Sequence, residues 1–194
     1  MTFFDLVKKS RSYRRFDASQ AITKETLVDL IETVRFTPAT VNIQPLKYAL
    51  SWEKPLNDKI FAHTRWAGLL TKEEFPPQTE EEQPTAYILI AADTEVNANA
   101  DTFKIDVGIC AQTIMLAAVE KGFGGCMIGS FDKKEVSELM GLTGRYVPML
   151  LLALGKPNDT VVTEDMPEGG ASAYYRVNGV QHVPKRTAAE LIVD

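Results

Sequence analysis

The stretch IDVGICAQTIMLAAVEKGFGGCMIGSFD, residues 105–132, holds the longest apolar run of the chain, and a glycine-rich segment follows it directly. Apolar residues fill 11 of the 15 positions from 105 to 119, and the polar residues Asp106, Gln112 and Thr113 interrupt them. The run is too short and too interrupted to predict a membrane span. It predicts instead a helix over 101–121 that is apolar nearly all round and must be covered on every side. Because one small domain covers such a helix poorly, we expect a second copy of the chain to cover part of it.

The glycine-rich segment predicts where this helix ends. The glycines between 122 and 125 stop the helix, and the apolar residues 126–128 predict a short buried strand. Asp132 is placed to cap a further helix. An apolar strand raises the pKa of a thiol, so we expect Cys126 to be an inert core residue.

Outside this stretch, the pattern predicts further helices and strands. Thr2 and Asp5 have the spacing of a capping box, which predicts a short helix before the basic residues that follow. A second helix is expected to begin after Thr23 and to stop before Pro38. The other predicted elements are strands at 48–52, 85–92 and 147–154 and a helix at 56–64. Several strands are apolar on both faces and no strict βαβ rhythm appears, so we predict an α+β fold with a mixed central β-sheet flanked by helices.

The length of 194 residues fits a single domain over 1–194. Residues 160–194 show no periodic pattern and are expected to form a C-terminal extension. Residues 73–82 contain five glutamates and two prolines. This composition favours a solvated mobile loop, and a lid over a substrate site is the alternative.

Composition and charge exclude several classes of function. A formal net charge of −5 argues against a nucleic-acid or membrane-binding surface. The two cysteines offer no disulfide framework, and no CxxC, HExxH or phosphate-loop motif predicts a metal or nucleotide-triphosphate site. The N-terminal residues MTFFDLVKKS lack the apolar core of a secretory signal, so we expect a cytoplasmic protein.

Two basic clusters stand out against the acidic background. One spans residues 8–15, and the other is Lys185 and Arg186, about 170 residues later. Two or three arginines with a serine hydroxyl suit a phosphate monoester, which carries about −1.5 to −2 charges and three acceptor oxygens. The alternative is that both clusters are solvated surface charges.

Four segments carry a resemblance to a known family, in the same order along the chain. They are RSYRRF at 11–16, PATVNIQP at 38–45, GFGGCMIGSFD at 122–132 and HVPKR at 182–186. The first three resemble the motifs RSxRxF, PSxxNxQP and GLGxxxIGG of the FMN-dependent nitroreductase family, and the fourth resembles the basic element near the end of those chains. The resemblance covers essentially the whole length and implies a nitroreductase-like fold that forms a homodimer with two shared FMN sites.

The resemblance also implies which residues bind FMN. The cofactor's phosphate is expected at Arg11, Ser12, Arg14 and Arg186, with Lys185 as a further candidate. The second motif is expected to reach the flavin of the other subunit through Pro38, Ala39, Thr40, Asn42 and Gln44. Ile128, Gly129 and Ser130 are expected to pass close to the flavin ring, where a glycine permits close approach. Asn42 and Gln44 could instead cap their own loop, and Arg15 is expected to face water.

This chain departs from the family pattern at three places. Ser10 stands where the family often has a basic residue, so the phosphate is one cation short unless Lys185 compensates. Ala39 replaces a serine, and Leu46 replaces a frequent aromatic residue.

The implied activity is reduction of small-molecule electron acceptors such as nitroaromatics or quinones, with NADH or NADPH as the reductant and ping-pong order. The flavin carries this chemistry, so no protein side chain is predicted as a catalytic acid or base. Arg14 is the candidate for stabilising charge on the reduced ring, and contact with the ribityl chain is the alternative. Residues 64–84, which include Trp66 and Phe75, and Tyr174 and Tyr175 are expected to shape the acceptor site. The alternatives are a non-catalytic flavin-binding protein, a sensor or store, and a reductive dehalogenase on the same scaffold.

Overall fold

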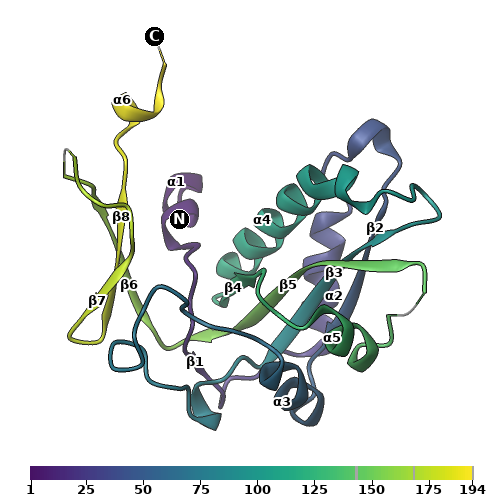
Figure 1. Ribbon diagram of the computed structural model, residues 1–194, viewed down its shortest axis with the longest axis horizontal. Helices are drawn as coiled ribbons and strands as arrows, with labels where there is room; N and C mark the ends of the chain where they lie inside the picture. The colour runs from purple at the N-terminus through teal and green to yellow at the C-terminus, as the bar shows by residue number, and fades with distance from the viewer. Residues whose placement is uncertain (143, 168, 194) are drawn as a thin grey trace.

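The computed structural model describes residues 1–142, 144–167 and 169–193, and its centre is a five-stranded sheet (Figure 1). The strands are β1 (Phe16–Asp17), β2 (Leu46–Ser51), β3 (Ala86–Asp93), β4 (Gly124–Ile128) and β5 (Tyr146–Pro157). β5 pairs with β1, β3 and β4, and β3 pairs with β2, in every case antiparallel. Among the described residues, parallel pairing reaches this sheet through the bridge between Ser12 and Gly125. The architecture agrees with the predicted α+β class.

Helices cover both faces of the sheet and create two apolar cores (Figure 1). α2 (Lys24–Val34) and α4 (Lys104–Glu120) pack on one face, and α3 (Lys54–Ala62) and α5 (Lys133–Leu139) on the other. Because successive side chains of a strand point to opposite faces, Ile88 joins the first core and Leu89 the second. This double coverage explains why the sequence of β3 is continuously apolar.

α4 is the long helix that the apolar run predicts, and a 3₁₀ turn over Ala100–Phe103 precedes it. Its inner face is fully buried at Ala111 and Ile114, whereas Ile105 is 75% exposed. By length and composition the segment Ala100–Glu120 could also cross a membrane, which corrects the interpretation from residues 105–119 alone. In this fold 56% of its most apolar window is buried, as in the core helix of a globular domain.

The glycines of β4 allow the first basic loop to lie directly against the sheet. A Cβ at Gly124 would stand 2.7 Å from the ring of Tyr13, and a Cβ at Gly125 would meet the backbone of β5. The Tyr13 amide donates to the Gly125 carbonyl at 2.9 Å. The loop that follows α1 (Phe3–Lys9) is thereby fixed along β4.

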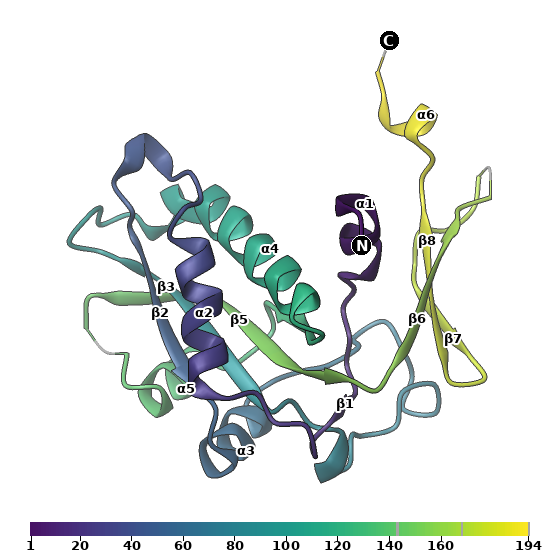
Figure 2. The same ribbon diagram turned by 180° about the vertical axis from the view of Figure 1, so that it is seen from behind.

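The C-terminal extension contains regular structure that its sequence pattern does not indicate. β6 (Thr160–Asp165), β7 (Tyr175–Val177) and β8 (Val180–Lys185) form a second, three-stranded sheet, and α6 (Ala188–Leu191) follows. β7 and β8 are joined by Asn178 and Gly179, both with positive φ, as tight hairpin turns require. The small sheet stands away from the main body, and α1 lies between it and α4 in both views (Figures 1 and 2).

Candidate functional site

A cavity of about 240 Å³ lies where the first basic loop, α4, β4 and the C-terminal sheet meet. Its polar lining comes from both ends of the chain, and Met115, Met127, Val161 and Val183 supply apolar surface. The polar or aromatic lining residues are Ser10, Arg11, Ser12, Arg14, Gln112, Tyr174 and Lys185. The fold therefore brings the two basic clusters of the sequence to one cavity, which we call the basic cavity.

The side chains of Arg11 and Arg14 are held differently at this cavity. Arg11 donates through Nη2 to the carbonyl of Val7 at 2.9 Å, so it also closes the last turn of α1. Its Nε is buried and has no hydrogen-bond partner within residues 1–142, 144–167 and 169–193. Arg14 donates to the Ser12 carbonyl at 3.2 Å, and its guanidinium lies 4.9 Å from the ring centre of Tyr174. Both arginines keep N–H groups that a bound anion could engage.

The C-terminal basic pair is divided between two environments. Lys185, at the end of β8, lines the basic cavity. Arg186 is not among the lining residues; its side chain is 53% exposed and stands 3.6 Å from Glu190. Of the two basic residues, the structure therefore places Lys185, the further candidate from the sequence, at the cavity.

The end of β4 provides a second boundary of the basic cavity. Met127 lines it, and the neighbouring residues Cys126 and Ile128 point into the core on the other face of the strand. Burial raises the pKa of the Cys126 thiol, as the sequence predicts. A Cβ at Gly129 would meet no atom within 4 Å, so packing within this chain does not require a glycine there. The Ser130 carbonyl accepts from the Arg65 amide at 3.0 Å.

The loop over residues 38–46 lies at the other end of α4, away from the basic cavity (Figure 1). It is anchored by Thr40, whose amide and hydroxyl donate to the buried carboxylate of Asp106. In this loop, three residues other than glycine have positive φ: Val41, Asn42 and Gln44. Val41 is β-branched and 84% exposed. Contacts with the described residues of its own chain therefore do little to offset the energetic cost of this backbone conformation. Strain of this kind is typical of functional loops.

The remaining residues of this motif lie in the same loop without contacting the basic cavity. Pro38 and Asn42 are exposed, and Ala39 and Gln44 line a separate cavity of about 210 Å³ under α2 and β2. Gln44 Nε2 donates to Asn42 Oδ1 at 3.4 Å. This contact supports the alternative that the two side chains cap their own loop. Within one chain, the motif at residues 38–45 therefore does not meet the motif at residues 11–16, which lines the basic cavity.

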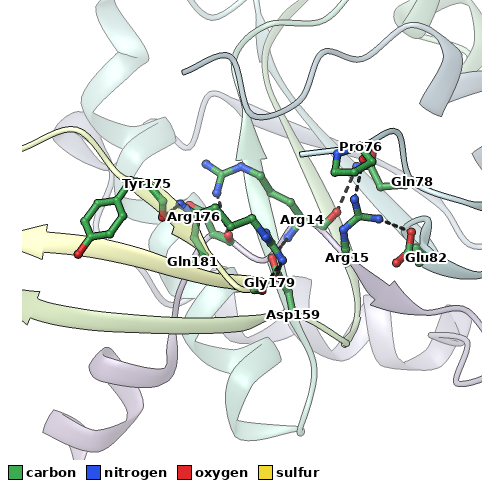
Figure 3. Close-up of polar contacts among 11 residues, drawn as sticks. Arg14, Arg15, Pro76, Gln78, Glu82, Asp159, Tyr175, Arg176, Gly179 and Gln181 are labelled. Carbon is green, nitrogen blue, oxygen red and sulfur yellow. Dashed lines mark hydrogen bonds and ion pairs between the residues drawn. The ribbon is translucent and has the colours of Figure 1, made fainter. Parts of the chain in front are cut away.

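Arg15 does not face water as expected, because it is bound to the segment over residues 73–82. Its guanidinium pairs with Glu82 and donates to the Pro76 carbonyl at 2.6 Å (Figure 3). It also lies 4.7 Å from the ring centre of Phe75. The Arg15 side chain is only 13% exposed, and Phe75 is 8% exposed. Arg15 thus fixes the segment to the fold at Phe75, Pro76 and Glu82, whereas most of its other residues are exposed, as their composition favours.

Of the aromatic residues expected at an acceptor site, Tyr174 is the one that lines the basic cavity. Its hydroxyl accepts from the Leu69 amide at 3.4 Å, which joins the cavity to the loop over residues 64–84. Tyr175 points instead to Glu164, to which its hydroxyl donates at 2.6 Å. Trp66 donates to the Thr64 hydroxyl and packs near the ring of Phe61.

Comparison with known proteins identifies the family of this fold. YdgI of Bacillus subtilis, which bears the name "Putative NAD(P)H nitroreductase YdgI", is 26% identical over 186 residues, covering 81% of this chain and 89% of YdgI. A nitroreductase family protein from Streptococcus pneumoniae TIGR4 superposes with a TM-score of 0.71 at 17% identity and covers all of both chains.

A second solved structure, from Exiguobacterium sibiricum 255-15 and in complex with FMN, gives a TM-score of 0.68 at 23% identity. It covers 82% of this chain and 90% of its own. The two structures establish the fold. The sequence profile of the nitroreductase family matches residues 7–156, and this chain therefore belongs to that family.

Proposed function

We propose that this protein is an FMN-dependent oxidoreductase that uses NADH or NADPH to reduce small conjugated acceptors such as nitroaromatics or quinones. The observation that carries the proposal is the basic cavity, where Arg11, Arg14 and Lys185 converge from opposite ends of the chain. Family membership and the names of the relatives support the same class of activity.

The residues at the basic cavity fit the phosphate group of FMN. A phosphate offers three strong acceptor oxygens, and the cavity offers two guanidinium groups, an ammonium group and the hydroxyls of Ser10 and Ser12. The buried Nε of Arg11 has no protein partner and would gain an acceptor. The open space beside Gly129 leaves the main chain accessible to a flat ring.

When bound, FMN supplies the redox chemistry by taking a hydride from a reduced nicotinamide and giving the electrons to the acceptor. The protein's own groups bind and orient. Arg14 carries a fixed positive charge beside Tyr174, where it can stabilise negative charge on a bound group. Met115 and Met127 exclude water from the inner wall of the cavity. The described geometry requires no side chain to transfer a proton.

The proposed active form is a homodimer in which each cavity is completed by the other subunit. Two features support it. α4 exposes Ile105 and Gly108 on the same side as Gln112, which lines the basic cavity. Val41, which has positive φ in the loop anchored by Thr40, is 84% exposed and so has little contact with the described residues of its own chain. A second copy packed on this side of α4 would cover both features.

Two measurements test the proposal. Apoprotein titrated with FMN should quench the flavin fluorescence with a saturable curve, and the holoprotein should lose its flavin absorption within the first turnover when mixed with NADH or NADPH in a stopped-flow instrument. Binding without bleaching by either nucleotide would point to the non-catalytic flavin-binding alternative. Absence of binding would overturn the proposal.

A further inference from the structure

A buried ion pair lies directly outside the basic cavity. Asp159 is in the turn between β5 and β6, and Arg176 is on β7. Arg176 Nη2 donates to Asp159 Oδ1 at 2.7 Å, and the two side chains are 10% and 1% exposed, respectively. The same Nη2 also donates to the Gly179 carbonyl at 2.8 Å in the β7–β8 turn. The C-terminal sheet is thereby joined to the end of the central sheet.

The ion pair also holds the main chain of Arg14 (Figure 3). The second carboxylate oxygen of Asp159 lies 3.4 Å from the Arg14 amide, which donates to it. On the other side of the same residue, Gln78 Nε2 donates to the Arg14 carbonyl at 3.1 Å. The next carbonyl, of Arg15, accepts from the Asn158 amide at 3.0 Å. Side chains from two distant segments thus hold the backbone of one residue.

The position of this backbone determines where the Arg14 guanidinium can reach. A side chain leaves the main chain along the Cα–Cβ bond, so a turn of the peptide unit moves a long side chain by several ångströms. In the observed position the Arg14 guanidinium lies over Tyr174 at the basic cavity. Neither Asp159 nor Arg176 lines that cavity.

A purely stabilising role explains this pair poorly. Desolvating two charges costs about as much as their attraction returns, so a buried pair is weak evidence for stability. The surroundings are also incompletely bonded, because Arg176 Nη1 and Gln181 Oε1, on adjacent strands, are buried and have no hydrogen-bond partner among the described residues. An arrangement selected only for stability would replace or complete these groups.

We infer that Asp159 and Arg176 are positioning residues that hold Arg14 in place for the phosphate of the cofactor. The inference rests on the proposed function, because it takes FMN as the ligand of the basic cavity. It adds Asp159, from the β5–β6 turn, and Arg176, from β7, to the binding of a group that they do not touch. It also explains why that sheet is anchored at its base while its outer end stands free of the main body.

The test compares FMN with riboflavin, which has the same ring and side chain but no phosphate. Apoprotein of the full chain is titrated with each flavin, and the ratio of the two dissociation constants reports the phosphate contacts alone. Asp159→Asn should lower this preference for FMN by about tenfold, which corresponds to about 1.4 kcal/mol, and leave riboflavin binding unchanged. Arg176→Lys, which keeps the charge but loses the planar fork, should lower it in the same direction.

Asp93→Asn is the matched control. Asp93 is a buried carboxylate, 5% exposed, paired with Arg145 at 3.0 Å on the far side of the sheet, and its variant should keep the wild-type preference even if it unfolds at a lower temperature. Equal weakening of both flavins in the Asp159 and Arg176 variants, or no weakening, overturns the inference alone. A wild-type protein that does not prefer FMN over riboflavin overturns the proposed function and the inference with it.

Discussion

Arg14 and Arg15 are adjacent, yet their side chains bind different parts of the fold. In extended backbone, successive side chains point to opposite sides. Arg14 therefore reaches the basic cavity, and Arg15 reaches Glu82 and the Pro76 carbonyl. The sequence identifies both as members of one basic cluster, but their partners are far along the chain. Which arginine faces a ligand is decided by tertiary contacts that no local pattern contains.

Alanine variants of Lys185 and Arg186 test which of these two residues binds FMN. Lys185→Ala should weaken FMN binding by about 1.5 kcal/mol, the lower end for hydrogen bonds to a charged group, because the side chain is partly screened by water. Arg186→Ala should change the binding free energy by less than about 0.5 kcal/mol, since its near neighbour is Glu190 on the exposed side of α6. Fluorescence titration of the two apoproteins gives both values. A larger effect at Arg186 would contradict the placement of Lys185 as the second anchor.

At the scale of elements, the sequence predicts the buried strands and helices and misses the exposed strands β6 and β7. β3 and α4 are recognisable because the core imposes an apolar pattern on them. The strands β6 and β7 alternate between exposed and partly exposed residues, so hydrophobic periodicity leaves no trace in residues 160–177. The capping boxes at Thr2 and the N-cap at Asp132 were predictable because they depend on residues within one turn.

Arg15 makes three of the contacts that hold the segment over residues 73–82. Arg15→Ala removes the ion pair to Glu82 and the bond to the Pro76 carbonyl, and it leaves Phe75 without the guanidinium on its ring. We expect a loss of about 1.5 to 3 kcal/mol in the free energy of unfolding, together with faster amide exchange over residues 75–82. Denaturant unfolding and hydrogen-exchange mass spectrometry measure the two effects.

Arg35→Ala is the control for that variant, because Arg35 is 57% exposed and its contacts are local, with Glu32 of α2 and the ring of Phe36. It should cost less than about 0.5 kcal/mol. If Arg15→Ala left the exchange rates over residues 75–82 at their wild-type values, the segment would be held by its remaining contacts and the assignment to Arg15 would be wrong.

The outer face of the C-terminal sheet carries a pH-dependent contact. Glu164 accepts from Tyr175 and lies 3.1 Å from His182 Nδ1, and these hydrogen bonds, the Tyr175 bond first, lower the pKa of Glu164 below its ordinary value. A carboxyl group with a lowered folded-state pKa contributes stability above its unfolded pKa, and this stability is lost as pH falls through the folded value. Glu164→Gln should therefore lower the melting temperature at about pH 7 but not at about pH 3. A difference of the same size at both pH values would contradict the role of ionised Glu164.

At the scale of the whole molecule, two halves of one predicted site lie at opposite ends of α4. The basic cavity is beside the C-terminal half of the helix, and the loop over residues 38–46 is bound to Asp106 in its first turn. The sequence motifs predict that both halves contact one flavin, and a single chain does not bring them together. The proposed homodimer would bring them together, and length and periodicity in one sequence cannot supply contacts between two chains.

Gly108 provides the test of that arrangement. It lies in the middle of α4, where a glycine costs about 1 kcal/mol relative to alanine, and a Cβ there would meet nothing within 4 Å. Packing within the chain therefore does not require this glycine, but close approach of a second copy would.

Gly108→Trp should fold as well as the wild type, run as a monomer in light scattering and lose FMN, because the partner's loop no longer reaches the cavity. Lys59→Trp, on exposed α3 across the sheet, should remain a flavin-bound dimer. A dimeric, FMN-loaded Gly108→Trp protein would place the subunit contact elsewhere and remove the explanation for the strain at Val41.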